Sequence, residues 1–353
     1  MRGKRLAALL LAIASPALAQ PVRPIVYVLA TGGTISGRGA SPTNLTDYRA
    51  GSLLGEELVR NVPAIAEVAD VRVEQIVNVG SPDISIANWL TIAKRINAIF
   101  ADDPKVAGVV ITHGTNTLEE TAYFLNLTVK HDRPVVLVGA QRPASAISAD
   151  GPLNLLNAIR TASSADARGK GVLTVMNDEI NGARDVTKTS TYRVETFRSP
   201  DLGFLGYVDE DKVSFYRAST KRHTVRSEFD VGALTELPKV EILYSYAQPN
   251  TIALDALVKS GVDGIVFAGT GAGLLSSAER NAIRAIASGS ARKPAMVRSS
   301  RVGTGRVVAS PQYDAMGMIP ADNLNPQKAR ILLMLALTKT KDTKEIARMF
   351  SEY

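Results

Sequence analysis

Apolar runs of two kinds alternate along most of the chain. Short runs rich in β-branched residues are separated by longer segments in which apolar residues recur every three or four positions. The short runs predict strands at residues 25–30, 71–77, 106–112, 134–139 and 171–176, and the longer segments predict helices at 86–100, 117–129 and 151–163. Alternation of this kind is typical of a largely parallel sheet with helices on both faces.

The pattern changes between residues 180 and 238, where Asp, Arg, Ser and Thr are frequent and no long apolar helix is visible. A second alternating set follows, with strands predicted at 239–247, 264–269 and 294–300 and helices near 250–260, at 274–288 and at 325–338. We therefore predict an α/β protein with two α/β domains and largely parallel sheets. The larger, N-terminal domain is expected at residues 22–215 and the smaller, C-terminal domain at 239–353, joined by an exposed linker at 216–238.

The first nineteen residues have the pattern of a secretory signal peptide. Arg2, Lys4 and Arg5 form a basic head, residues 6–14 are all apolar, and Ala17-Leu18-Ala19 is an A-x-A cleavage signal. The apolar run is shorter than the roughly 20 residues that cross a bilayer. We expect cleavage after Ala19, a periplasmic or secreted location, and no membrane association of the mature chain.

Composition excludes several functions. The net charge of +7 falls to about +4 after cleavage, with no basic run interleaved with aromatics, so we expect no nucleic-acid partner. Cysteine is absent, which excludes disulfides and a thiol nucleophile. The histidines are His113, His131 and His223, and no two have metal-ligand spacing, so no metal site is expected. A Ser-His-Asp triad would need one of these three as its base, so hydrolysis here is expected to use other residues.

A nucleotide cofactor is also not expected. Gly32, Gly37 and Gly39 follow a predicted strand, but their spacing is not G-x-G-x-x-G, and "AGTGAG" at 268–273 is a similarly weak match. Neither stretch contains the P-loop lysine. A dinucleotide-dependent oxidoreductase is therefore a distant alternative, which NAD(H) binding would reveal.

Two loops carry unusual polar chemistry at the carboxyl ends of predicted strands, where ligands bind in open parallel sheets. "ATGGTISGRG" (30–39) offers tight glycine geometry and the hydroxyls of Thr31, Thr34 and Ser36. "THGTNT" (112–117) precedes a helix whose capping box would be Thr117 and Glu120, and its free N–H groups favour an anionic ligand such as a carboxylate. Taken one at a time, either loop could be an ordinary turn. Lys188, Ser81, Asp83 and Tyr48 are further candidates that singly would be read as surface charge, turn or packing residues.

Together these stretches resemble the bacterial type II L-asparaginases and the similar glutaminase-asparaginases. The two main motifs are "LATGGTI" (29–35) and "GVVITHGTNTLEETAYFL" (108–125). Supporting stretches are "RPASAISADGPLNLLNA" (142–158), "RDVTKT" (184–189), "LPKVEILYSY" (237–246) and "LNPQKARILLMLALT" (324–338). The resemblance covers essentially the whole mature chain.

The resemblance implies hydrolysis of an amino-acid side-chain amide to an acid and ammonia, without a cofactor. It implies that Thr34 is the nucleophile and that Tyr48 orders over it. It also implies that Thr115 and Lys188 relay protons together with the residue at the family's aspartate position, here Asn116. It also implies substrate contacts from Ser81, Pro82, Thr115 and Asn116, and a homotetramer built from intimate dimers. A desolvated lysine can activate a hydroxyl where histidine is scarce.

Three positions depart from the family pattern. Asn116 stands where the family has an aspartate, so it lacks the charge that would pair with the substrate's α-ammonium or with Lys188. Proline at position 82 has no backbone donor. In the C-terminal domain, Ala272 replaces a polar residue of some relatives, and Asp314 is the acidic residue nearest to the expected glutamate. We therefore expect slowed asparagine or glutamine hydrolysis, the alternative being a catalytically silent relative that binds amino acids.

Overall fold

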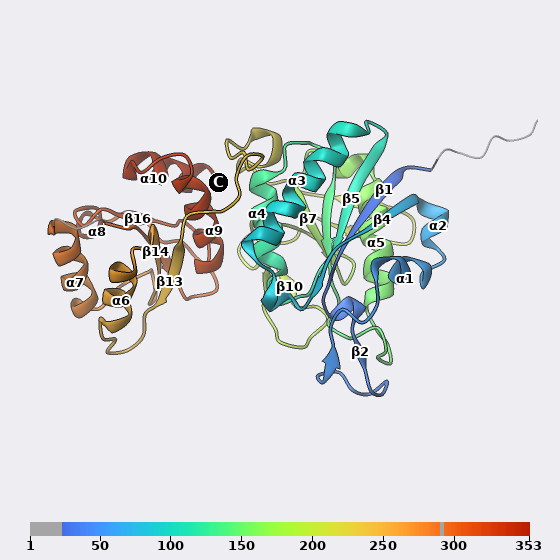
Figure 1. Cartoon of the computed structure of the whole chain (residues 1–353), viewed down its shortest axis with the longest axis horizontal. Helices are drawn as coiled ribbons and strands as arrows, with labels where there is room; N and C mark the ends of the chain where they lie inside the picture. The colour runs from blue at the N-terminus through green and yellow to red at the C-terminus, as the bar shows by residue number, and fades with distance from the viewer. Residues whose placement is uncertain (1–22, 290–292) are drawn as a thin grey trace, which may run out of the picture.

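The structure is a computed structural model that describes residues 23–289 and 293–353. The predicted signal peptide at 1–19 lies outside the described residues. A larger N-terminal and a smaller C-terminal α/β domain lie side by side (Figure 1). None of the described helices has both the length and the apolar character needed to cross a bilayer.

The N-terminal domain is built on an eight-stranded sheet with the order β12-β11-β8-β7-β6-β5-β1-β4. Its strands are β1 (Ile25–Gly32), β4 (Asp70–Val79), β5 (Val106–Thr112), β6 (Val135–Val138), β7 (Val172–Met176), β8 (Glu179–Gly182), β11 (Gly206–Val208) and β12 (Val213–Phe215). β4, β1, β5, β6 and β7 are parallel, as predicted. The three antiparallel strands were not predicted, because each has only three or four residues and lies in a polar part of the chain.

Helices cover both faces of this sheet (Figure 1). α3 (Ile86–Asp102) and α4 (Leu118–Thr128) pack on one face, and α1 (Gly55–Arg60), α2 (Ile65–Val68) and α5 (Gly151–Ser163) pack on the other. Side chains alternate between the faces: Leu29 belongs to the first core, whereas Val26 and Val28 belong to the second. Burial on both faces explains why the strands read as continuous apolar runs.

The C-terminal domain contains a four-stranded parallel sheet with the order β13-β14-β15-β16. Its elements are β13 (Val240–Tyr244), α6 (Ile252–Ser260), β14 (Gly264–Gly269), α7 (Ser277–Ser288), β15 (Ala295–Ser300), α8 (Pro311–Asp314), β16 (Met318–Pro320), α9 (Pro326–Leu337) and α10 (Thr343–Glu352). α9 faces the N-terminal domain and shares one hydrophobic core with α4 (Figure 1). α10 was not predicted, although the residues that it buries, Ile346, Met349 and Phe350, have the spacing of an amphipathic helix.

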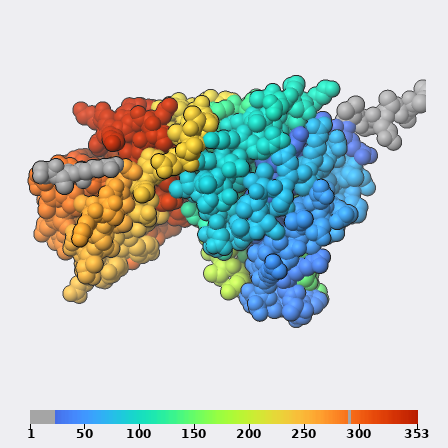
Figure 2. Space-filling model, viewed as in Figure 1, coloured from blue at the N-terminus to red at the C-terminus, as the bar shows by residue number. Residues whose placement is uncertain are grey.

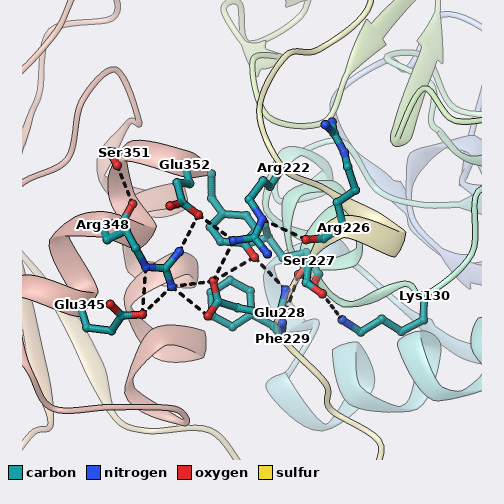
Figure 3. A network of polar contacts seen from close by, with 12 residues as sticks. Lys130, Arg222, Arg226, Ser227, Glu228, Phe229, Glu345, Arg348, Ser351 and Glu352 are labelled. Atoms are coloured by element: carbon teal, nitrogen blue, oxygen red, sulfur yellow. Dashed lines mark hydrogen bonds and ion pairs between the residues drawn. The ribbon is translucent and has the colours of Figure 1, made fainter.

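The segment between the domains is partly buried, which corrects the expectation of an exposed linker. In Figure 2 this yellow-to-gold stretch lies between the blue-green N-terminal and the orange-red C-terminal domain. Phe229 and Val231 are 1% exposed within it. Figure 3 shows how its polar groups hold it: Glu228 accepts hydrogen bonds from Arg348 of α10, and Lys130 donates to the carbonyl of Ser227 at 2.7 Å. The segment therefore forms part of the packing between the domains.

Tyr353 supports this arrangement and allows a stability prediction. It is fully buried, and its hydroxyl accepts a hydrogen bond from the backbone N–H of Glu228 at 2.7 Å. Tyr353→Phe leaves that N–H without its partner and is expected to lower the free energy of unfolding by about 1–3 kcal/mol. Urea denaturation measures the loss, with Tyr216→Phe, at a 70% exposed tyrosine, as the matched control. Equal stability of the two variants would contradict the prediction.

Candidate active site

Three loops meet at the carboxyl ends of the adjacent parallel strands β4, β1 and β5. These ends point to the edge of the sheet from which the hairpin of β2 (Arg38–Gly39) and β3 (Tyr48–Arg49) projects (Figure 1). Each loop brings a buried hydroxyl to this edge: Thr34, Ser81 and Thr115 are 7%, 3% and 4% exposed. The topology therefore places together three residues that are far apart in the sequence.

Glycines allow the loops to approach this closely. Gly33 has a φ of 84°, and a Cβ there would lie 2.3 Å from the backbone of Gly114. A Cβ on Gly114 would in turn lie 2.7 Å from Ser81 Oγ. A side chain at either position would push the loops apart, so both glycines are required for the contact between backbones.

Thr34 begins the short 3₁₀ helix Thr34–Ser36, and its hydroxyl is paired with a tyrosine. Thr34 Oγ1 lies 2.6 Å from the hydroxyl of Tyr48, which the β2–β3 hairpin places over it. The other hydroxyls of this loop are used structurally: Thr31 donates to the carbonyl of Thr112, and Ser36 donates to that of Gly33. Thr34 is therefore the hydroxyl of this loop that a polar side chain contacts.

The amine of Lys188 lies between Thr115 and Asn116. Lys188 is in the two-residue strand β9 (Thr187–Lys188), and its Nζ donates to Thr115 Oγ1 at 2.8 Å and to Asn116 Oδ1 at 3.1 Å. Burial lowers the pKa of Lys188, because the charged form loses hydration. A neutral amine still has two N–H donors for these contacts and also a free lone pair, as a general base requires.

Hydrogen bonds of Ser81 and Thr117 join the loop after β4 to the loop after β5. Ser81 Oγ accepts the backbone N–H of Asn116 at 3.1 Å, and Thr117 Oγ1 donates to the carbonyl of Ser81 at 2.7 Å. α4 begins after Thr117, as predicted, but no side-chain hydrogen bond caps it. The predicted capping box of Thr117 and Glu120 is therefore wrong, because the carbonyl of Ser81 takes up the threonine hydroxyl.

The remaining predicted residues lie elsewhere. Pro82 follows Ser81 in the 3₁₀ helix Ser81–Asp83 and is exposed. Asp314 is an exposed residue of α8, on the side of the C-terminal domain away from the N-terminal sheet (Figure 1). Ala272 is also exposed. The structure of one chain thus brings together Thr34 with Tyr48, and Thr115 with Asn116, Lys188 and Ser81, but it does not bring Asp314 to them.

Two residues beside Lys188 were not predicted. Glu119 of α4 is 5% exposed and accepts the backbone N–H of Lys188 at 3.0 Å, and Gln327 of α9 donates to its second carboxylate oxygen at 2.6 Å. The signal for Glu119 was a charged residue on the buried side of a predicted helix. No signal pointed to Gln327, which comes from the other domain.

His113 holds the loop after β5 in place from within the hydrophobic core. It is fully buried, its Nδ1 lies 2.7 Å from the carbonyl of Gly114, and its Nε2 lies 3.0 Å from Thr121 Oγ1. Because a carbonyl only accepts, Nδ1 carries the proton, and neutral His113 accepts from the Thr121 hydroxyl at Nε2. Trp89 Nε1 donates to the same hydroxyl at 2.8 Å. His113 is therefore a structural residue and not a catalytic base.

This burial predicts a loss of stability in acid. Desolvation lowers the pKa of His113 to about 4. The unfolded chain takes up a proton near the ordinary histidine pKa of about 6.5, whereas the folded chain does so only near 4, so the stabilisation is present above pH 6.5 and is lost as the pH falls to 4. His113 alone is expected to contribute about 2 kcal/mol to the loss between pH 7.5 and pH 5.

Urea denaturation of the parent chain and of His113→Gln at both pH values measures this effect. His223 also has its pKa lowered to about 4 by burial, so His223→Gln serves as the matched comparison. The loss in acid should shrink in His113→Gln. An unchanged pH dependence in that variant would show that His113 is protonated in the folded chain.

An open cleft runs past Lys188. Asn116, Glu119, Tyr192 and Gln327 line it together with residues 187–191. Within residues 23–289 and 293–353, no three His, Cys, Asp or Glu side chains gather in a way that could hold a metal ion. The chemistry that these residues offer is that of paired hydroxyls, an amine and an amide.

Comparison with known proteins assigns this arrangement to a family. The family model for the N-terminal asparaginase domain matches residues 25–221, and the model for the glutaminase/asparaginase C-terminal domain matches residues 239–350. The chain belongs to the asparaginase family. Members of this family named as L-asparaginases and glutaminase-asparaginases are similar along nearly its full length.

A probable periplasmic L-asparaginase of Haemophilus influenzae is 48% identical, with 94% of this chain and 93% of that protein covered. A glutaminase-asparaginase of Pseudomonas fluorescens is also 48% identical, with 93% and 90% covered. The crystal structure of a probable cytoplasmic L-asparaginase from Campylobacter jejuni matches with a TM-score of 0.90 and 47% identity, covering 94% of this chain and all of that one. The predicted fold class is thereby confirmed, and the chain is an amidohydrolase of the asparaginase and glutaminase-asparaginase type.

Proposed function

We propose that this asparaginase-family chain hydrolyses the side-chain amide of L-asparagine, and also that of L-glutamine, through an acyl-enzyme on Thr34. The observation that carries the proposal is the contact between the Lys188 amine and Thr115 Oγ1, 2.8 Å, at the sheet edge where Thr34 pairs with Tyr48. A threonine hydroxyl is a weak nucleophile near neutral pH and needs a neighbouring base. A half-buried lysine whose pKa is lowered by burial can supply one.

In the proposed mechanism, Thr34 Oγ1 attacks the amide carbon and its proton passes into the hydroxyl and amine groups of the site. The neutral Lys188 amine turns so that its lone pair, in place of an N–H, faces Thr115 Oγ1. Thr115 then gives its proton to the amine and takes up the proton from the nucleophile. The C–N bond then breaks, ammonia leaves with a returned proton, and water hydrolyses the ester. Backbone N–H groups of the glycine loops would stabilise the oxyanion, at about 2.7–4 kcal/mol for each donor.

The α-carboxylate and the α-ammonium of the substrate are proposed to bind at the neighbouring loops. Ser81 Oγ lies beside the first residues of α4, where a hydroxyl and free backbone N–H groups suit an α-carboxylate. Asn116 offers its carbonyl oxygen to the α-ammonium, in competition with Lys188. This weaker, uncharged acceptor is the departure from the family pattern that lies closest to Lys188.

Trapping the intermediate tests the mechanism. The protein is mixed with asparagine and quenched in acid within one turnover, and its intact mass and peptide map are recorded. An added aspartyl group on the peptide that contains Thr34 is expected. Steady ammonia release with the acyl group on another residue would overturn the assignment.

Asn116 also keeps a second function open. A relative that binds amino acids without hydrolysing them would retain the Ser81 and α4 contacts and lose turnover. Calorimetry with aspartate and asparagine, run beside an ammonia-release assay, separates the two: binding without ammonia release would support the silent relative.

We further propose that the chain acts as a homotetramer of intimate dimers. β13 is an edge strand of the C-terminal sheet, and Ile242, Tyr244 and Tyr246 on and beside it are 37%, 57% and 49% exposed. Exposed apolar side chains on an unpaired edge are typical of an interface. A partner chain would also supply the acidic residue that Asp314 does not provide within one chain. Sedimentation of the purified protein as a monomer would contradict this.

Export is proposed from the first nineteen residues. Fractionation of cells that express the full chain should recover protein beginning at Gln20 in the periplasm or the medium. Recovery of the uncleaved chain in the cytoplasm, the location named for the similar Campylobacter jejuni protein, would refute it.

A further inference from the structure

The strand that carries Lys188 is held from the C-terminal domain. Lys328 of α9 is 2% exposed, and its Nζ donates to the carbonyls of Arg184, at 2.9 Å, and Val186. These carbonyls lie four and two residues before Lys188. A buried amine with two backbone acceptors fixes the path of this segment, because the hydrogen bonds cannot be exchanged for water there.

A second contact fixes the backbone of Lys188 itself. Glu119 accepts the Lys188 N–H with Oε2 at 3.0 Å and the side-chain amide of Gln327 with Oε1 at 2.6 Å. Both carboxylate oxygens of a nearly buried side chain are thus used, one toward β9 and one toward the first turn of α9. This arrangement leaves the carboxylate little freedom to turn, so the position of Gln327 is transmitted to the Lys188 backbone.

α4 contributes to both ends of Lys188. Its first turn carries Glu119, which holds the backbone, and the two residues before its cap are Thr115 and Asn116, which hold the amine. Both the backbone and the amine of Lys188 are therefore held by residues in or just before α4, provided that α9 keeps Glu119 in place. α4 and α9 share a hydrophobic core, so this polar bridge lies across a packed contact between domains.

We propose that Glu119 and Gln327 are positioning residues, through which docking of the C-terminal domain sets the place of the Lys188 amine at Thr115. This inference rests on the proposed role of Lys188 as a base. Neither residue is assigned a contact with the substrate. They act on turnover through the geometry of the relay, where a displacement of about 1 Å can lower a rate by about 10²-fold.

An exchange of the two side chains tests the proposal. Gln327→Glu places two carboxylates against each other, and we expect kcat to fall by about 10- to 100-fold while KM changes by less than about threefold. Glu119→Gln gives a smaller loss, because the Gln327 amide can turn to accept a hydrogen bond. In the double variant the amide at position 119 donates to the carboxylate at position 327 and still accepts the Lys188 N–H, so kcat should return to within about threefold of the parent.

The controls separate this inference from the proposed function. Asn281→Asp makes the same amide-to-carboxylate change at an exposed position of α7 and should leave kcat unchanged. Lys188→Met should lower kcat by about 10²-fold or more. All variants are also made in an Asn116→Asp background, so that slow turnover does not limit the measurement.

Each outcome decides one of the two ideas. Full activity of Lys188→Met would overturn the role of Lys188, and with it this inference. A dead Lys188→Met beside a fully active Gln327→Glu, or a double variant that stays as slow as Gln327→Glu, would overturn the positioning role alone. If Gln327→Glu does not fold, Gln327→Ala removes the bridge without repulsion and should still lower kcat severalfold with KM retained. Unchanged kcat in that variant would reject the proposal.

Discussion

Thr34→Val is expected to reduce ammonia release from asparagine by at least about 10³-fold. Valine keeps the branched shape of a side chain that is 7% exposed and removes only the hydroxyl that Tyr48 contacts at 2.6 Å. Without Oγ1 no ester can form, and the remaining groups can act only on water. Activity in such variants then comes from binding and oxyanion stabilisation, which leave a small part of the original rate.

The matched control is Thr161→Val. Thr161 is fully buried in α5 and donates to the carbonyl of Asn157, so this variant also loses one hydroxyl from a packed site. Both variants should lose about 1 kcal/mol of stability, and only Thr34→Val should lose turnover. Steady-state ammonia release and urea denaturation provide the two measurements. If Thr34→Val stays within tenfold of the parent, the nucleophile lies elsewhere.

The arrangement of the sheet was readable because burial on both faces leaves a strong signal. β1 contributes Leu29 to one core and Val28 to the other, and a short, β-branched apolar run of this kind is typical of a central strand. The same logic fails where burial is slight. β11 and β12 have three residues each, and α10 buries three side chains among many charges. Nothing in the sequence distinguishes β11 and β12 from loops. α10 does have a helical signal that the prediction missed, because Asp342 caps it and Ile346, Met349 and Phe350 recur at helical spacing.

The residues of the site likewise fall into those that the sequence pattern could predict and those that it could not. Thr34 and Thr115 each follow a strand with a clear apolar pattern, and β1 and β5 are parallel neighbours, so their loops lie at one edge of the sheet. Their position could therefore be predicted from the strands and the motifs. The hydrogen bond between Glu119 and Gln327 joins residues 208 positions apart in different domains. Periodicity marks the faces of α4 and α9 that are buried, but it does not show which polar side chains meet there. The hydroxyl of Thr117 shows the same limit, because the competing carbonyl of Ser81 comes from another loop.

Asn116→Asp is expected to raise kcat/KM for asparagine by about 10²-fold, as the net result of two opposing effects. Leaving a charge unpaired in a closed site costs on the order of 3–5 kcal/mol, and an aspartate would pair with the substrate's α-ammonium and with Lys188. The same aspartate lies within reach of the Lys188 amine, whose Nζ now donates to Asn116 Oδ1 at 3.1 Å, and would raise its pKa. Each unit by which the pKa of Lys188 rises makes its neutral form less favourable by about 1.4 kcal/mol. Charge pairing outweighs the rise in the lysine pKa, so about 2–4 kcal/mol of gain remains after a rise of one unit.

The pH profile shows both effects at once. Activity rises with pH as Lys188 loses its proton, so the rising limb of kcat should move to higher pH in Asn116→Asp, while KM for asparagine falls. Asn116 is exposed although Tyr48 already contacts Thr34, so its cost is felt when the substrate covers it. Asn281→Asp, at an exposed position of α7 in the C-terminal domain, is the control for the change of charge and should leave KM unchanged. Equal kcat/KM for Asn116→Asp and the parent chain would mean that the amide already does what the family's carboxylate does.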